Sequence, residues 1–354
     1  MAVAGAGAFG RNHLRVLREL EDAGHGVSLV AAVEPLPERA ADVAAHFGIP
    51  VFASVEELLR ADLRLHAACV AVPTVQHRAV AAVLLDAGLD LLVEKPLAAT
   101  LNEADDLVAR AQRAARILQP GHLERFNPAV LAIEPRLKRP MFFEAHRLSI
   151  FTPRSLDVDV VLDLMIHDLD IVLTFAASPV REVRAVGLPI LSPKVDIANV
   201  RVEFESGCVA NFTASRVSTE KVRKLRFFEP RQYVSIDYAR RELLVIRMED
   251  AARGLPPAIA AALASGQADS ALLAQLAAGN ASGPAPGLSF VKPEVAPGEP
   301  LRLEIESFLD AVRTRRPPHV TARQGRDALA LALEIQAAMA AHAQRAGLGD
   351  FFHP

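Results

Sequence analysis

The sequence has few cysteines and no long apolar run, and both absences exclude common classes of protein. Only two of its 354 residues are cysteines, Cys69 and Cys208, and both lie in apolar, strand-like runs far apart in the chain. Such a pair builds neither a disulfide framework nor a zinc cluster, so we expect two small core residues in a reducing compartment. No run approaches the roughly 20 apolar residues of a membrane helix, and no signal peptide opens the chain. We therefore expect a cytoplasmic protein without a membrane partner.

The chain also lacks a large excess of charge of either sign. A net charge of −3 provides no broad positive field for a phosphate backbone, so no nucleic-acid partner is expected. With 51% hydrophobic and 23% charged residues, the composition is that of a globular protein. A length of 354 residues suits two domains and leaves room for a cleft between them.

Short apolar runs alternate with helical stretches over the first third of the chain. The runs lie at 27–33, 66–72, 89–94 and 115–120. Because they are continuously apolar, they indicate parallel strands buried on both faces, which predicts a doubly wound α/β domain over residues 1–120. The first strand, at 1–4, is short for a central strand, which favours a natural start a few residues upstream.

The pattern changes to strict alternation in the second part of the chain, residues 121–354. Alternating runs are typical of antiparallel strands with one buried face, so a second sheet is expected. An Ala- and Leu-rich stretch at 322–346 predicts a long helix that packs back toward the first domain. Residues 250–300 look like an insertion with a short helix near 257–277. The predicted strands are 199–204, 208–215, 222–228, 232–237 and 242–246.

A glycine-rich segment between the first strand and the first helix matches the GxGxxG pattern of dinucleotide-binding proteins. Glycine allows a tight turn there, and it lets backbone amides approach a pyrophosphate at a helix N-terminus. Glu34 ends the next strand at the expected distance; it can bind ribose hydroxyls and repel a 2′-phosphate, so NAD is the predicted cofactor. Arg39 nearby weakens the discrimination against NADP. The predicted contacts in the glycine segment are Gly5, Gly7, Ala8, Phe9 and Gly10.

Glu94-Lys95-Pro96 follows a buried strand, so Lys95 is placed at the edge of the sheet where ligands bind. Its ammonium group could donate to a substrate hydroxyl and favour deprotonation. A lysine at a strand end is equally often a solvated surface residue.

The apolar stretch 157–175 carries a stripe of polar residues at helical spacing: Asp159, Asp163, His167 and Asp170. Ionised carboxylates are not buried unpaired, so the stripe should face partners or a wet cleft. An imidazole with a carboxylate one turn away suits acid–base catalysis, with Asp163 orienting His167. The alternative is a structural histidine held in the core by an aspartate. A metal site is less favoured because no second histidine lies nearby.

These motifs together resemble the Gfo/Idh/MocA family of oxidoreductases. The resemblance rests on the glycine segment 5–10, on 72–74 with His77, on 94–96, and on Asp163 four residues before His167. It implies a Rossmann domain followed by an α/β domain with an open-faced sheet. The implied catalytic residues are Lys95 and His167, with Asp163 beside them. Further implied cofactor contacts are Pro73, Thr74, His77, Glu94 and Pro96.

One position departs from the family pattern: Met165 stands where many relatives carry glycine, which puts the fit of this helix to the nicotinamide in doubt. The segments 121–128 and 157–170 are similar to the branch that oxidises C3 of UDP-N-acetylglucosamine. That branch makes a 3-keto sugar for later amination in lipid A assembly. Within 121–128 the candidate substrate ligands are Arg125 and Asn127.

A sugar nucleotide requires a cationic site for its diphosphate. The candidates lie on or beside strands of the second domain, although a basic strand face is more often merely solvated. They are Arg147, Arg154, Arg216, Lys221 and Lys224.

Two other functions compete with this prediction. The first is oxidation of a free sugar or inositol, for which the basic residues have no use. The second is a non-catalytic NAD-binding sensor or scaffold, which has no need of Lys95 or His167. In each case an open sheet surface calls for covering, so a homodimer or homotetramer is expected.

Overall fold

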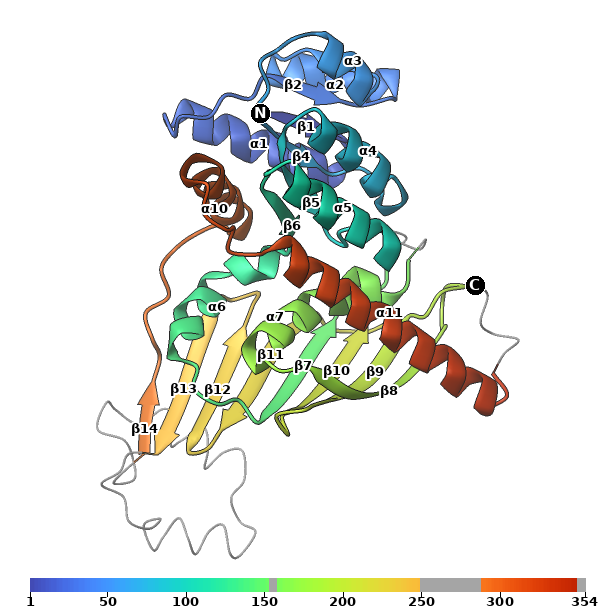
Figure 1. The fold of residues 1–354 in the computed structure, drawn as a ribbon. Coiled ribbons are helices and arrows are strands. Elements are labelled where there is room, and N and C mark those ends of the chain that lie inside the picture. The colour runs from blue at the N-terminus through green and yellow to red at the C-terminus, as the bar shows by residue number, and fades with distance from the viewer. Residues whose placement is uncertain (153–157, 249–287, 349–354) are drawn as a thin grey trace, which may run out of the picture.

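Two sheets and a set of helices form the protein. The computed structural model describes residues 1–152, 158–248 and 288–348. Figure 1 shows the first sheet with its helices at one end of the molecule and the larger sheet at the other, with α6, α7 and α11 between them. Arg154 and the helix expected at 257–277 lie outside the described residues.

The first sheet is a six-stranded parallel sheet of order β3-β2-β1-β4-β5-β6. Its central strands are buried along their whole length, which explains their uninterrupted apolar sequences. This confirms the doubly wound N-terminal domain. The strands are β1 Ala2–Ala4, β2 Ala31–Val33, β3 Val51–Phe52, β4 Ala67–Val70, β5 Asp90–Glu94 and β6 Leu118–Gly121.

Helices connect these strands, and several have clear stop and start signals. Helix α5 begins at a capping box in which Thr100 and Glu103 satisfy each other's backbone amides. Helix α2 has Pro37 in its first turn and ends at Gly48 in the left-handed region. The helices are α1 Ala8–Asp22, α2 Pro37–Phe47, α3 Val55–Arg60, α4 Thr74–Asp86 and α5 Leu101–Arg113.

The second sheet has eight strands in the order β14-β13-β12-β11-β7-β10-β9-β8. Every neighbouring pair is antiparallel except β7 with β10, so the mostly antiparallel sheet is confirmed. The strands are β7 Phe142–Leu148, β8 Val180–Leu188, β9 Ile197–Phe204, β10 Val209–Ser215, β11 Val222–Glu229, β12 Gln232–Asp237, β13 Glu242–Met248 and β14 Leu288–Val291.

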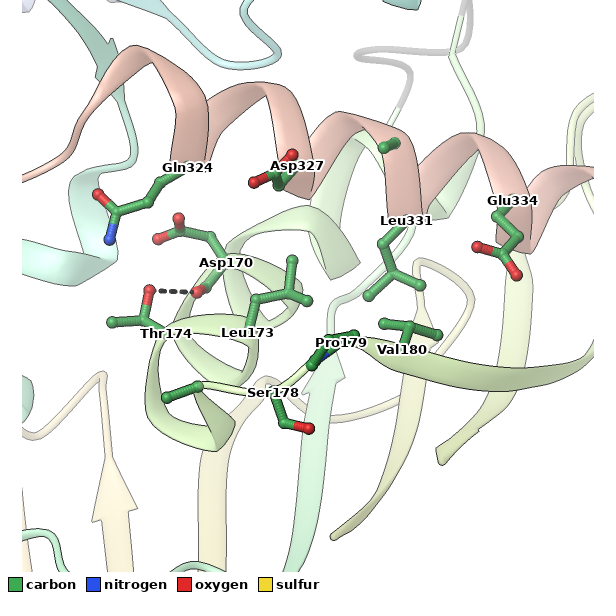
Figure 2. Close-up of a pocket in the computed structure, with 12 residues that line it drawn as sticks. Asp170, Leu173, Thr174, Ser178, Pro179, Val180, Gln324, Asp327, Leu331 and Glu334 are labelled. Atoms are coloured by element: carbon green, nitrogen blue, oxygen red, sulfur yellow. Dashed lines mark hydrogen bonds between the residues drawn. The ribbon is translucent and has the colours of Figure 1, made fainter. Parts of the chain in front are cut away.

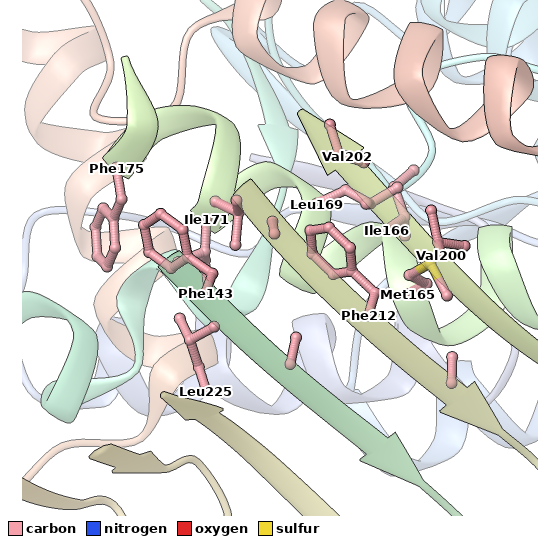
Figure 3. Close-up of a cluster of buried hydrophobic side chains, with 14 of the residues drawn as sticks. Phe143, Met165, Ile166, Leu169, Ile171, Phe175, Val200, Val202, Phe212 and Leu225 are labelled. Carbon is pink, nitrogen blue, oxygen red and sulfur yellow. The ribbon is translucent and has the colours of Figure 1, made fainter. Parts of the chain in front are cut away.

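One face of this sheet is covered by helices, and alternate strand residues on that face are buried. Figure 3 shows the core, in which Phe143, Phe212 and Val200 of the sheet pack against Met165 and Leu169. The segments beyond β6 that cover the sheet or return to the first domain are the 3₁₀ turns η1 Leu123–Phe126 and η2 Glu134–Arg136, the π-turn η3 Val161–Met165, and helices α6 Pro128–Ile133, α7 Ile166–Ala176, α10 Pro300–Thr314 and α11 Ala322–Arg345.

The C-terminal helices tie the two parts together. Helix α11 packs on β8 and α7 and also touches α5 and β6, as expected for the 322–346 helix. Helix α10 belongs to the core of the first domain, where Ile305 and Phe308 join residues of α1 and β4. Both Cys69 and Cys208 are free and buried. Among the described residues, no helix is both long and apolar enough to cross a bilayer.

Candidate active site

A cleft of about 450 Å³ lies where the carboxyl ends of the parallel strands meet α7 and the second sheet. This is the edge at which open α/β sheets bind ligands. Many of the residues singled out from the sequence meet here, from both parts of the chain. Those that line the cleft are Phe9, Pro73, Thr74, His77, Glu94, Lys95, Pro96, Arg147, Asp163 and His167.

A second cavity, of about 590 Å³, lies between α7 and α11 and contains none of these residues. Figure 2 shows the carboxylates of Asp327 and Glu334 on α11 above it and Asp170 on α7 beside it. Three carboxylates repel the phosphates of a dinucleotide or a sugar nucleotide. The cleft beside Lys95 is therefore the candidate active site.

The glycine turn fits a dinucleotide. Gly5 adopts a positive φ of 90°, and a Cβ atom there would lie 2.6 Å from the carbonyl oxygen of Ala71. Gly7 is the N-cap of α1, no side chain caps this helix, and a Cβ on Gly7 would meet no atom within 4 Å. The first amides of α1 therefore face open space, as an anion-binding helix N-terminus requires.

Glu34 lies directly beside this turn and is 3% exposed. Its carboxylate accepts hydrogen bonds from the backbone amides of Ala6, at 3.2 Å, and Leu36, at 3.1 Å, and from Arg39 at 3.3 Å. A smaller cavity of about 370 Å³ begins at Gly5 and the end of β2 and shares Val72 with the cleft. The two cavities thus adjoin at Val72, between the glycine turn and Lys95.

Lys95 follows β5 at a cis Lys95–Pro96 peptide bond. Its ammonium group donates to the backbone carbonyl of Asp163 at 2.6 Å and lies 3.7 Å from the Asp163 carboxylate. Burial lowers the pKa of Lys95, and the neighbouring Asp163 carboxylate partly opposes that shift. The ammonium group of Lys95, from the first domain, thus contacts the segment Val161–Met165 of the second domain.

The polar residues of 159–170 do not form the single stripe predicted from the sequence. The stripe was expected on one regular helix, but the wider turn at Val161–Met165 breaks the three-and-four spacing. Asp159 caps the turn through the amides of residues 161 and 162, and Asp170 lies away from the cleft, 3.8 Å from Arg125. Asp163 was expected to orient His167; its carboxylate instead pairs with Lys95.

His167 reaches the cleft from the first turn of α7. Burial lowers its pKa well below 6.5, and the positive charges of Lys95 and Arg147 lower it further. The imidazole is therefore neutral at neutral pH and available to accept a proton. No hydrogen bond holds its Nδ1 atom within the described part of the chain.

His77 and Glu94 shape the wall of the cleft. The two ring nitrogens of His77 lie 2.8 Å from the carbonyl of Pro96 and 2.9 Å from that of Val72, so the imidazole joins the loops after β4 and β5. Glu94 is held at 2.6 Å by the buried His13. Although burial opposes it, the pKa of His13 is raised by Cys69 and by this carboxylate. The partner of Glu94 was missed from the sequence because His13 lies 81 residues away.

Among the predicted substrate ligands that the structure describes, Arg147 is the one that lines the cleft. Asp168 accepts two hydrogen bonds from its guanidinium group, at 2.8 and 3.1 Å, and Glu124 accepts one at 3.0 Å. These carboxylates outweigh the effect of burial and raise the pKa of Arg147. Arg147 thus stays protonated, and the two carboxylates balance its charge.

The other predicted substrate ligands lie elsewhere. Arg125 is buried against Thr174 and Glu134, and Asn127 caps α6 and binds Glu124. Arg216 is buried and bonds Asp196 at 2.6 Å. The two lysine candidates do not line the cleft either: Lys221 is exposed, and Lys224 lies 3.9 Å from Asp237.

Two polar residues of the cleft were not identified from the sequence: Glu124 and Arg223. Arg223 lies opposite Arg147 in the register of β11 with β7. The predicted alternation of strand 222–228 could have identified it, because Arg223 shares a face with the buried Leu225 and Phe227. Among the described residues, no group of three or more His, Cys, Asp or Glu side chains could hold a metal ion.

Comparisons with known proteins agree with this geometry. Residues 1–122 match the profile described as "Oxidoreductase family, NAD-binding Rossmann fold", and residues 130–231 match the GFO/IDH/MocA C-terminal domain. The chain is 34% identical to UDP-N-acetylglucosamine 3-dehydrogenase of Acidithiobacillus ferrooxidans, over 97% of this chain and 98% of that protein. A solved structure of that enzyme superposes with a TM-score of 0.81, at 33% identity and coverages of 96% and 97%.

A more distant relative is scyllo-inositol 2-dehydrogenase (NAD(+)) of Bacillus subtilis, 26% identical over 61% of this chain and 67% of that protein. The family's NAD-binding Rossmann domain and its C-terminal domain thus occur together here. The chain belongs to the Gfo/Idh/MocA family of NAD-dependent oxidoreductases.

Proposed function

We propose that the protein oxidises C3 of the sugar ring of UDP-N-acetylglucosamine to a ketone. The observation that carries this proposal is that an ammonium group from the first domain and a neutral imidazole from the second line one cleft beside the glycine turn. The similarity to UDP-N-acetylglucosamine 3-dehydrogenase over nearly the whole chain supports the substrate.

The residues of the cleft divide the work as follows. His167 accepts the proton of the sugar hydroxyl while the hydrogen on the adjacent carbon leaves as hydride, so that the C–O single bond becomes a carbonyl. Lys95 donates a hydrogen bond to the hydroxyl oxygen and stabilises its developing negative charge. Asp163 holds Lys95 in place. NAD, when bound over the glycine turn, supplies the hydride acceptor.

The test is a substrate panel with NAD and hydroxylamine, which traps a ketone product. We expect NADH formation with UDP-N-acetylglucosamine and little with free N-acetylglucosamine or inositol. A substrate deuterated at C3 should transfer its label to the cofactor, which identifies the carbon oxidised. NADH formation with a free sugar or inositol alone would favour that rival function, and NAD binding without turnover of any sugar would favour a sensor.

The pH dependence of kcat/KM provides a second test. His167 must be neutral and Lys95 protonated; because both pKa values are lowered, the acid limb should fall well below pH 6.5 and the alkaline limb below 10.5. Asp163→Asn removes a charge that raises the pKa of Lys95, so the alkaline limb should move to lower pH. The largest causes of the lowered pKa of His167 are burial and the charges of Lys95 and Arg147, so the acid limb should move less than the alkaline limb. An alkaline limb that stayed in place or rose would contradict these roles.

We also propose that a second copy of the chain covers the open face of the large sheet, in a homodimer or homotetramer. That face carries an aromatic cluster: Phe142 stacks on Phe228, with ring centroids 5.4 Å apart, and Phe228 contacts Tyr233 at 5.2 Å. Partly exposed aromatic clusters of this kind favour association. Light scattering after size exclusion should give two or four times the monomer mass.

We further propose that the enzyme works in the cytoplasm, a reducing compartment suited to two buried free thiols. A 3-keto sugar nucleotide is a substrate for amination, so we place the reaction before an aminotransfer step in lipid A assembly.

A further inference from the structure

Arg223 stands out in the cleft by its position on the sheet. It belongs to the row of β11 side chains that faces the helices, two residues before Leu225 and four before Phe227, both buried. Unlike these two, Arg223 is exposed, because its end of the strand reaches into the cleft. Arg223 therefore lies on the same side of β11 as these core residues, but it lines the cleft.

In the part of the cleft that the structure describes, the other charged residues pair with residues other than Arg223. Lys95 pairs with Asp163, Glu94 with His13, and Arg147 with Asp168. Within the described part of the chain, no carboxylate or hydrogen-bond acceptor is paired with Arg223. Its neighbour directly across the strands is another arginine, Arg147, whose charge Asp168 and Glu124 already balance, so these two carboxylates are not left over for Arg223.

The positive charge of Arg223 also acts on the reacting group, since it contributes to the lowered pKa of His167. It lies on the second-domain side of the cleft, whereas the glycine turn that suits the cofactor's pyrophosphate lies in the first domain. An anionic substrate beside NAD therefore needs its own cation, and a planar guanidinium group binds phosphate oxygens in pairs.

We propose that Arg223 binds the diphosphate of a nucleotide-sugar substrate and thereby selects sugar nucleotides over free sugars. This assignment rests on the proposed function and names the residue that sets its substrate class. It differs from the expectation from the sequence, which placed this role on Arg147, Arg154, Arg216, Lys221 and Lys224.

The test compares Arg223→Met with Arg323→Met, a matched loss of one exposed arginine on α11 outside the cleft. Charge-assisted hydrogen bonds to phosphate predict that Arg223→Met raises KM for UDP-N-acetylglucosamine, and the inhibition constant of UDP, by about tenfold or more. The KM for NAD should not change, and kcat should stay within a few-fold. Arg323→Met should behave as the wild-type protein does.

Equal UDP inhibition of the wild-type protein and Arg223→Met would overturn the assignment, as would an equal rise in KM for NAD. Calorimetric titration with UDP separates this assignment from the proposed function. Binding of UDP that depends on Arg223, without oxidation of any UDP-sugar, would retain the anion site and refute the reaction. Oxidation of UDP-N-acetylglucosamine that did not depend on Arg223 would support the proposed reaction and refute the anion site.

Discussion

Replacement of His167 by asparagine is expected to lower kcat by about 10²- to 10⁴-fold, the range typical of a positioned acid–base residue. Asparagine keeps a polar side chain, but it cannot take up a proton at neutral pH. NADH formation at saturating NAD and UDP-N-acetylglucosamine measures the loss. The KM for NAD should change little, since the cofactor-binding turn lies in the other domain.

Lys95→Met should cause a loss of similar size, because hydrogen bonding to the hydroxyl oxygen and acceptance of its proton occur in the same step. Residues that act as a unit give non-additive losses, so the double variant should be little worse than either single variant. Lys95→Met also removes a charge that lowers the pKa of His167, so its acid limb should move to higher pH. This shift separates a role in the cleft from simple misfolding.

His25→Asn provides the control, because His25 is an exposed histidine near α10 and does not line the cleft. It should retain wild-type turnover. If the variants at His167 and Lys95 turned over at near the rate of the His25 control, the proposed acid–base assignment would be abandoned.

Strands and site residues could be predicted from the sequence where a single local segment determines their position. Continuous apolarity located β4 and β5, and alternation located β9 to β13, because burial on two faces or on one leaves a direct pattern in the residues. The lysine after β5 and the histidine of the 157–175 segment were found for the same reason, since each follows from the position of a local element.

Partners that come from distant segments could not be predicted in this way. Asp163 pairs with Lys95 because a π-turn alters the helix before α7, and helical periodicity contains no signal for that turn. Arg216 looked like a ligand because its carboxylate partner, Asp196, is brought close only by the pairing of β9 with β10. The contact of Arg216 with Asp196 cannot be derived without the register of the sheet.

Substitutions in the glycine turn should separate its role in NAD binding from its role in folding. In Gly7→Ala the new methyl group enters open space, so the protein without cofactor should fold with an unchanged Tm. That space is where a pyrophosphate must approach the backbone, so the Kd for NAD should rise by about tenfold or more. Calorimetry measures the Kd, and the thermal shift caused by NAD should shrink in parallel.

Gly10→Ala should show the opposite behaviour. Its Cβ would fall 1.9 Å from the carbonyl oxygen of Gly5, and a main-chain atom cannot rotate away as a side chain can. The turn must open, and overpacking of this kind typically costs about 1–3 kcal/mol, so the Tm should fall even without cofactor. A Gly7→Ala variant that bound NAD normally would show that the pyrophosphate does not lie over this turn. An unchanged Tm for Gly10→Ala would contradict a structural role for the close contact between α1 and the turn.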